Sequence, residues 1–270
     1  EEIRREGEDI PFPGWETLRE ESLERGPLVL LLVRDEEGTP VRQVEGPARP
    51  GLHRVSWDLR RPAPDPVDLS TPGFIPPWAS DPQGPLVAPG TFTVEMMMVS
   101  ARGVERLGEP TTFQVKPVPT VAPGTDFQAV AEFQWETSRL ARRVAGAGEE
   151  IGRVQERLRH MRAALLRTPR ADPSLFARMD ALNRDLDALR TRLSGDPIRG
   201  RWNEPNVPPI RGRLGTARGL WDTRMEPTET MRRDLEIATA DFAELEDELV
   251  SLVEGRLMTL EEDLAAGGAP

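Results

Sequence analysis

The feature that most constrains this 270-residue chain is an uninterrupted seam of apolar or small side chains in its second half. The seam recurs at alternating spacings of three and four residues, which keeps its side chains on one side of an α-helix. It consists of Val130, Phe133, Thr137, Leu140, Val144, Ala147, Ile151, Val154, Leu158, Met161 and Leu165. The sequence therefore predicts a helix about 60 Å long from about Thr125 to Leu166, capped by Thr125-Asp126 and ended by Pro169.

Two later segments repeat this pattern. Asp172 and Pro173 open the first of them, with Asp as N-cap and Pro in the first helical position, and Gly195 closes it. Its seam is Leu175, Met179, Leu182, Leu186, Leu189 and Leu193. The last segment, from about Thr228, carries Met231, Leu235, Ala238, Phe242, Leu245, Leu249 and Leu252, and then Val253, Leu257, Leu260 and Leu264, one residue out of phase. We expect the first two helices to pair antiparallel with the last alongside, and the slip indicates that the last helix changes or loses neighbours.

Between about residues 27 and 118 the pattern is that of short strands. An apolar run at 28–33 and strand-like segments at 91–99 and 111–115 alternate with turn residues, and 51–59 shows the period-two alternation of a strand. Several short strands with regular turns favour a β-sandwich. We expect its core to contain Val55, Trp57, Phe92, Val94, Phe113 and Val115. The proline-rich stretch 61–88 is expected to be a surface loop that packs Phe74, Ile75 and Trp78 on the sandwich or on a neighbour.

Composition disfavours several function classes. With 46 acidic and 35 basic residues the net charge is -11, so nucleic acid is not an expected partner. The chain has no Cys and only two His, His53 and His160, which lie far apart in the sequence. The absence of Cys excludes thiolate chemistry and sulfur-ligated zinc. Two distant histidines also disfavour a His-based catalytic triad on composition. The longest apolar run, 28–33, is too short for a transmembrane segment, and we expect neither a cofactor nor a metal.

The order of motifs carries a resemblance. An Asp-x-x-Gly turn between strands, then Gly51-x-x-x-Val55-x-Trp57-Asp58, a loop and Pro89-Gly90-Thr91 resemble the immunoglobulin-like repeat of the flagellar hook-cap protein FlgD. Together with the proline-rich loop and the helical tail, they resemble the region that follows the β-propeller in bacterial sortilin-like, BNR-repeat proteins, often labelled glycosyl hydrolases. The resemblance implies an α+β chain in two domains, located outside the cytoplasm. The expected parts are a connector at 1–26, an immunoglobulin-like β-sandwich at 27–118 and an antiparallel helical bundle at 119–270.

Two groups of residues could form a sugar site. Trp57 and Asp58 combine an aromatic platform with a carboxylate, although a Trp that alternates with Val55 is more typical of a core. Asp65, Asp68 and Asp81 could converge with Trp78 as the carboxylate pair of a glycosidase. We favour the interpretation of that stretch as a surface excursion.

Two further groups could contact a partner. Arg199, Arg201 and Trp202 could hold an anionic ligand or a partner's carboxylates; alternatively the arginines satisfy helix C-terminal carbonyls and Trp202 plugs the end of the bundle. A stripe of small residues on the first long helix allows another backbone to approach, either from the same bundle or from a partner subunit. The stripe consists of Ala141, Ala145, Gly148 and Gly152.

From these patterns we expect a non-catalytic interaction module, the C-terminal accessory part of a secreted β-propeller-type protein. Its partner would be another protein or a preceding propeller domain, and it could form oligomers through the bundle. The alternatives are accessory domains of a glycosidase-like enzyme whose active site lies elsewhere, and a structural subunit of an envelope or extracellular assembly.

Overall fold

The chain divides into two compact units in the computed structural model, which describes residues 12–24, 26–69, 74–79, 81–118, 124–219 and 225–269. One unit comprises Glu1–Asp58 and Gly90–Lys116, and the other comprises Leu59–Pro89 and Pro117–Pro270. The first is built on a sheet and the second on helices, so the fold class is α+β. The proline-rich loop, which we expected within the sheet domain, groups with the helices. Residues 1–11 and 25 of the expected connector lie outside the described residues.

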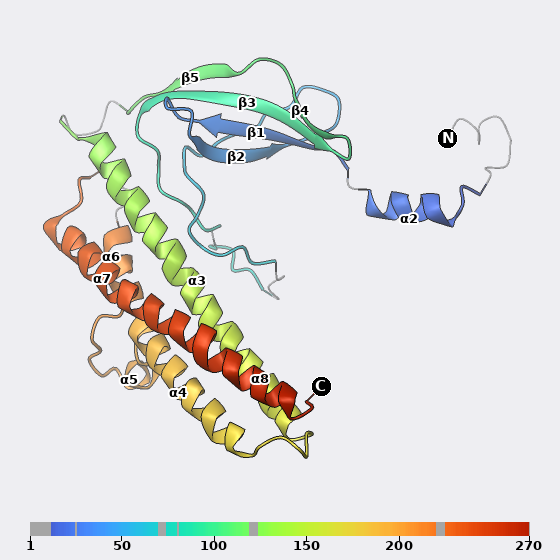
Figure 1. The fold of residues 1–270 in the computed structure, drawn as a ribbon. Coiled ribbons are helices and arrows are strands. Elements are labelled where there is room, and N and C mark those ends of the chain that lie inside the picture. The colour runs from blue at the N-terminus through green and yellow to red at the C-terminus, as the bar shows by residue number, and fades with distance from the viewer. Residues whose placement is uncertain are drawn as a thin grey trace. The chain divides into compact units, whose positions relative to one another are not determined.

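The sheet unit contains a five-stranded antiparallel sheet (Figure 1). A short helix, α2 (Trp15–Leu23), precedes it. The strands are β1 (Leu28–Arg34), β2 (Pro40–Gly46), β3 (Gly90–Ser100), β4 (Gly103–Arg106) and β5 (Thr111–Val115). Their order is β2-β1-β3, and both β5 and β4 pair with β3, β5 along its first half and β4 along its second. β3 is therefore the strand around which the sheet is organised.

The β1–β2 hairpin closes as the sequence predicts. Gly38 has a φ of 80°, which a residue with a side chain rarely adopts, and its N–H donates to the carbonyl of Asp35. β1 then pairs with β3 in a register that places Val33 opposite Val94.

The stretch 51–59, predicted as a strand, is not one in the structure: residues 51–58 make no strand pairing, and a single isolated bridge joins Arg60 to Leu86. Of the six residues expected in the sandwich core only Phe92 is buried and the other five are half-buried, but the three aromatic rings pack together. The ring centroid of Trp57 lies 5.4 Å from that of Phe92 and 6.2 Å from that of Phe113, both edge-on. Phe92 and Phe113 are directly opposite each other in the β3–β5 register. Residues 51–58 thus cover a face of the sheet without adding a strand to it.

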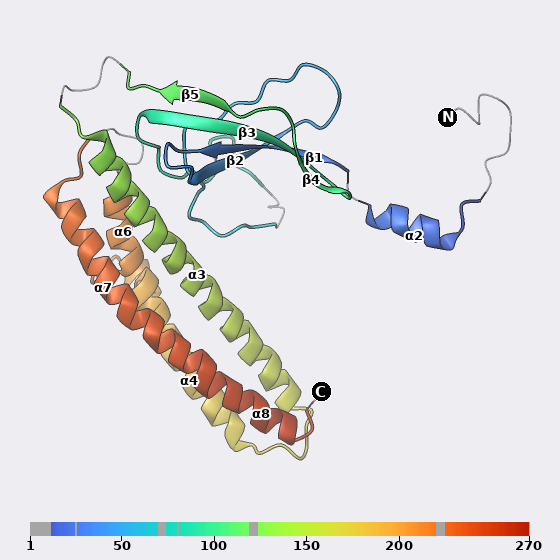
Figure 2. The ribbon, with the colours of Figure 1, turned by 45° about the horizontal axis from the view of Figure 1, so that its top comes forward.

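The helical unit contains α3 (Phe127–Leu165), α4 (Ser174–Ser194), α5 (Pro197–Arg201), α6 (Ile210–Arg218), α7 (Glu229–Ser251), the π-helical segment η1 (Leu252–Leu257) and α8 (Met258–Ala266). α3 and α4 form the expected antiparallel hairpin, and α7 and α8 run along it (Figures 1 and 2). All eleven residues of the first seam and all six of the second are buried. The prediction of a helical region with long helices is confirmed. None of the helices within the described ranges combines the length and apolarity needed to cross a bilayer.

The start of α3 follows the sequence, whereas α4 begins at Ser174, one residue later than predicted, with Pro173 and not Asp172 at the N-cap. Asp126 caps α3 by accepting a hydrogen bond from the backbone N–H of Ala129, at 3.0 Å. Asp172 accepts from the backbone N–H and the hydroxyl of Ser174 at the start of α4, at 2.8 and 2.7 Å.

The phase slip near the end of the last helix corresponds to η1. A π-helical turn closes with an i→i+5 hydrogen bond and so contains one residue more than an α-helical turn. The extra residue brings the following seam back to the inside, where Leu257, Leu260 and Leu264 are buried. α7 contacts α6, α3 and α4, whereas α8 contacts α4 and α3. The helix therefore changes neighbours, as we expected, but keeps its packing.

Ion pairs between helices accompany the apolar seams. Arg143 of α3 pairs with Glu246 of α7, and Arg256 of η1 pairs with Asp185 of α4. Arg178 of α4 lies 2.5 Å from Asp263 of α8. These pairs are largely exposed, so each adds little stability, but together they favour one alignment of the helices.

Candidate functional site

The proline-rich loop of the helical unit is closed by a short antiparallel neck. The N–H of Arg61 donates to the carbonyl of Pro85 at 2.8 Å, and the N–H of Val87 donates to that of Leu59 at 2.9 Å. Gly84 is essential to this approach, because a Cβ there would lie 2.0 Å from the carbonyl oxygen of Arg61. The neck fixes both ends of the loop 62–84.

The base of the loop also packs against the helices. Pro64 is less than 2% exposed, and the guanidinium of Arg61 lies over the ring of Trp135 in α3, 4.7 Å from its centroid. Pro64 and Pro66 face Ala141 and Ala145 of α3 across a small pocket of about 300 Å³. The small side chains of the stripe therefore leave room for the base of this loop.

Beyond this base the loop presents large apolar side chains to solvent. Its apolar tip, as we call it, comprises Val67, Leu69, Phe74, Ile75 and Trp78. Each of these side chains is between 65% and 91% exposed. These side chains do not pack on the helices of their own unit, and their packing on the sandwich or on a neighbour stays a prediction. A β-turn at 76–79, in which the N–H of Ala79 donates to the carbonyl of Pro76 at 2.9 Å, shapes the second half of the tip.

The charge of the loop has a single sign. From position 62 to position 83 the sequence has Asp65, Asp68 and Asp81 and no basic residue. All three aspartates are exposed, and of the three only Asp65 borders a described pocket, the one between the loop base and α3. No described contact brings the three carboxylates together around Trp78 as a glycosidase pair would require.

The second half of the small-residue stripe has different neighbours. A Cβ on Gly148 would meet the guanidinium end of Arg211 from α6 and a methyl group of Leu193 from α4. At Gly152 a Cβ would meet nothing within 4 Å, and this glycine borders a groove between α3 and α4. Segments of the same chain thus approach the stripe at Ala141, Ala145 and Gly148, whereas Gly152 is open.

The arginine and tryptophan cluster follows α4. Asp196 caps α5 by accepting from the N–H of Ile198 at 2.8 Å, and Arg199 donates to the carbonyl of Pro205 at 3.2 Å. Arg201 is exposed and Trp202 is 73% exposed, so Trp202 does not plug the end of the bundle. The arginine bond to Pro205 also stays within the connector and does not satisfy a helix end.

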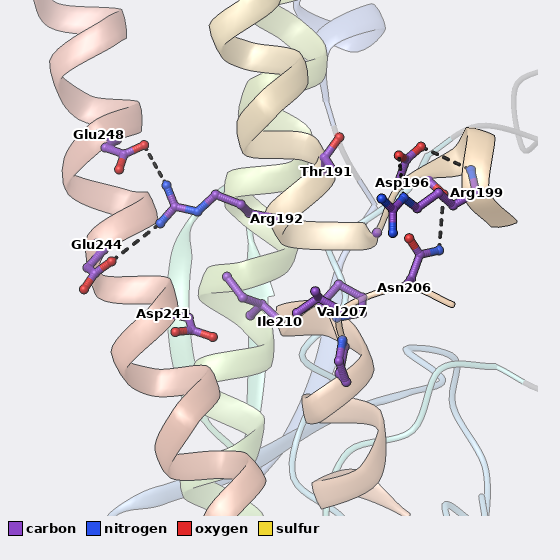
Figure 3. A pocket seen from close by; sticks show the side chains of 13 residues that line it. Thr191, Arg192, Asp196, Arg199, Asn206, Val207, Ile210, Asp241, Glu244 and Glu248 are labelled. Atoms are coloured by element: carbon purple, nitrogen blue, oxygen red, sulfur yellow. Dashed lines mark hydrogen bonds and ion pairs between the residues drawn. The ribbon is translucent and has the colours of Figure 1, made fainter. Parts of the chain in front are cut away.

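A cleft of about 650 Å³ lies between this connector, the end of α4 and α7 (Figure 3). Arg192 projects across it from α4 to Glu248, at 2.7 Å, and to Glu244, at 3.8 Å. Arg199 lies 3.9 Å from Asp196 on the other side. Both guanidiniums therefore face carboxylates of the chain itself, and the cleft carries charges of both signs.

The other residues considered from the sequence, Trp57, His53 and His160, make ordinary contacts within the fold. Trp57 is half-buried against Phe92 and Phe113, which favours the core interpretation over a sugar platform. Nε2 of His53 lies 2.8 Å from the carbonyl oxygen of Arg49, and His160 is exposed with Nε2 3.1 Å from Glu156. The described residues contain no group of three or more His, Asp or Glu placed to hold a metal ion.

Comparison of the chain with protein-family models, with curated proteins and with solved structures gave no match. The surfaces of the molecule therefore have to be interpreted from their own chemistry. Among the surfaces described above, the apolar tip is the one whose exposure is hardest to explain by the fold of this chain alone, because burying its side chains would be favourable.

Proposed function

We propose that this chain is a non-catalytic interaction module that binds another protein through the apolar tip of its proline-rich loop. The observation that carries the proposal is the exposure of five large apolar side chains within twelve residues of sequence. Scattered single apolar residues are normal on a protein surface, but a group of them marks a contact site.

The fixed base of the loop supports this function. The neck, the buried Pro64 and the cation–π contact of Arg61 reduce the number of conformations that the loop loses when it binds, and a smaller entropy loss gives a tighter complex. A fixed base with an exposed tip is the arrangement expected of a binding loop.

We further propose that the sheet unit is a reduced immunoglobulin-like sandwich of the FlgD-like kind, in which residues 51–58 replace a strand of the second sheet. The packing of Trp57 on Phe92 and Phe113 supports this interpretation. On the motif resemblance alone, we also propose that the chain lies outside the cytoplasm as the C-terminal accessory part of a β-propeller-type protein. The partner of the tip would then be such a propeller or a separate protein.

The proposal is tested by capture on immobilised chain from an extract of the source cells. The test variant replaces all five tip residues by Ser. The matched control replaces Leu52 and Leu166, which are exposed outside the loop, by Ser. We expect the native chain and the control to retain the same protein and the test variant to lose it. Equal retention by the test variant would contradict the proposal, as would the absence of any protein held specifically.

A further inference from the structure

We propose that the part of the tip formed by Phe74, Ile75 and Trp78 enters an apolar pocket with a basic rim on the partner protein. This inference rests on the proposed function and adds to it the chemistry of the partner. It follows from the local conformation of the loop and from its charge.

The turn at 76–79 restricts the backbone that carries Trp78. Pro77 occupies the second position of the turn, where its fixed φ suits a β-turn, and Pro76 restricts the residue before it. Phe74 and Ile75 precede the turn, and Trp78 occupies its third position. Large aromatic side chains, Trp above all, are typical of the few residues that supply most of the energy of a protein interface. The matching surface is a pocket with an apolar floor.

The negative charge of the loop indicates the charge of the rim around the partner's pocket. Three carboxylates and no cation lie between positions 62 and 83, and the whole chain has a net charge of -11. A partner with Lys or Arg around its pocket would be attracted over a long range, and contacts with acidic surfaces would be repelled. The same charge disfavours a second copy of this chain and an anionic lipid surface, since both are negative.

The test uses the full chain carrying the photo-crosslinking residue p-benzoylphenylalanine in place of the exposed Ala79, next to Trp78, irradiated in the source cells. Mass spectrometry of the adduct then identifies the partner peptide. We expect an apolar segment flanked by Lys or Arg. Flotation with vesicles of phosphatidylglycerol and phosphatidylethanolamine, and the mass of the chain in solution by light scattering, test the lipid surface and the second copy.

Variants measured against the captured protein, once purified, test each part of the inference. We expect Trp78→Ala to weaken binding by about 30-fold or more, as for a residue at the centre of an interface. Pro77→Ala keeps every tip side chain and should weaken binding by about 2- to 5-fold through the loosened turn. Pro82→Ala, an exposed proline of the same loop outside the turn, is its matched control and should have no effect.

The charge is tested separately. Raising the salt concentration should weaken binding of the native chain, and this dependence should be much smaller when Asp65, Asp68 and Asp81 are all replaced by Asn. Normal affinity of Trp78→Ala would overturn this inference and leave the interaction module standing. An adduct with an acidic surface, with lipid or with a second copy of the chain would do the same. Failure to capture any protein would remove both proposals.

Discussion

At the scale of single residues, some glycines occupy positions where no other residue fits, whereas others could be replaced without a clash. A Cβ on Gly84 would lie 2.0 Å from the carbonyl oxygen of Arg61 and 2.5 Å from that of Pro62. Both are backbone atoms that no side-chain rotation can move. We expect Gly84→Ala to break the neck of the loop at a cost of about 1–3 kcal/mol, which amide hydrogen exchange at Arg61 and Val87 would detect.

The control for this substitution is Gly152→Ala on α3. A Cβ there would have no atom within 4 Å, so the substitution should stabilise the helix by up to about 1 kcal/mol. If exchange at Arg61 and Val87 were as slow in Gly84→Ala as in the native chain, the neck would not depend on this glycine.

Asp172 gives a pH-dependent prediction at the same scale. The hydroxyl of Ser174, and then its backbone N–H, donate to the carboxylate and lower the pKa of Asp172. Because the pKa in the folded state lies below that in the unfolded state, the stabilisation is fully present above the unfolded value, about 4, and is lost as the pH falls through the folded value. The amide oxygen of Asn can still accept a hydrogen bond from Ser174, but Asn does not titrate in this range. We therefore expect Asp172→Asn to retain stability at neutral pH and to lose less of it in acid.

The measurement is urea unfolding of the helical unit at a series of pH values below about 5. Asp241→Asn, an exposed aspartate in the middle of α7, serves as the control and should follow the native curve. If the free energy of unfolding fell equally with pH in the native chain and in Asp172→Asn, the Asp172 carboxylate would not contribute to the pH dependence of stability.

At the scale of elements, the helices could be predicted because their signal is local. Burial of every third or fourth side chain identifies a helix and its inner face whatever its partner is, and the whole α3 seam is buried as expected. The stretch 51–59 could not be assigned in this way. Alternation shows that a segment is extended with one side covered, but a strand also needs a neighbour for its backbone, and that neighbour is remote in sequence.

The candidate site shows the same limit. The prolines of 61–88 correctly predicted a surface loop, yet nothing local to Phe74, Ile75 and Trp78 distinguishes a side chain that packs on its own chain from one left exposed. Likewise, the stripe on α3 predicted a close approach but not that Pro64 and Pro66, some 75 residues earlier in the sequence, would face Ala141 and Ala145.

The phase slip in the last helix gives a prediction about an element. If η1 exists only to absorb one extra residue, deleting the exposed Glu254 should convert it to α-helix and leave both flanking seams in register. We expect a melting temperature close to that of the native chain. Deleting the exposed Asp241 instead should rotate the segment up to η1 and move Phe242, Leu245 and Leu249 away from the inside, at a cost of several kcal/mol. Similar losses for the two deletions would contradict this role of η1.

At the scale of the whole molecule, the two units have separate cores. The connected cluster of buried side chains in the helical unit runs from Phe133 to Leu264 and includes no residue of the sheet. Leu182 is fully buried in that cluster, whereas Phe92 is buried in the sheet unit against Trp57 and Phe113. A substitution in one core should therefore destabilise the unit that contains it.

We expect Leu182→Ala to lower the stability of the helical unit by about 2–5 kcal/mol, because the cavity left by a buried leucine is only partly refilled. Phe92→Ala should lower that of the sheet unit by about 3–5 kcal/mol. Hydrogen exchange read by mass spectrometry can follow peptides from β1 and β3 separately from peptides of α4 and α7. Each substitution should accelerate exchange in its own unit and leave the other at its native rate. If either substitution accelerated exchange in both units equally, the chain would unfold as a single cooperative structure, and its loop and sheet could not be altered independently in the binding experiments.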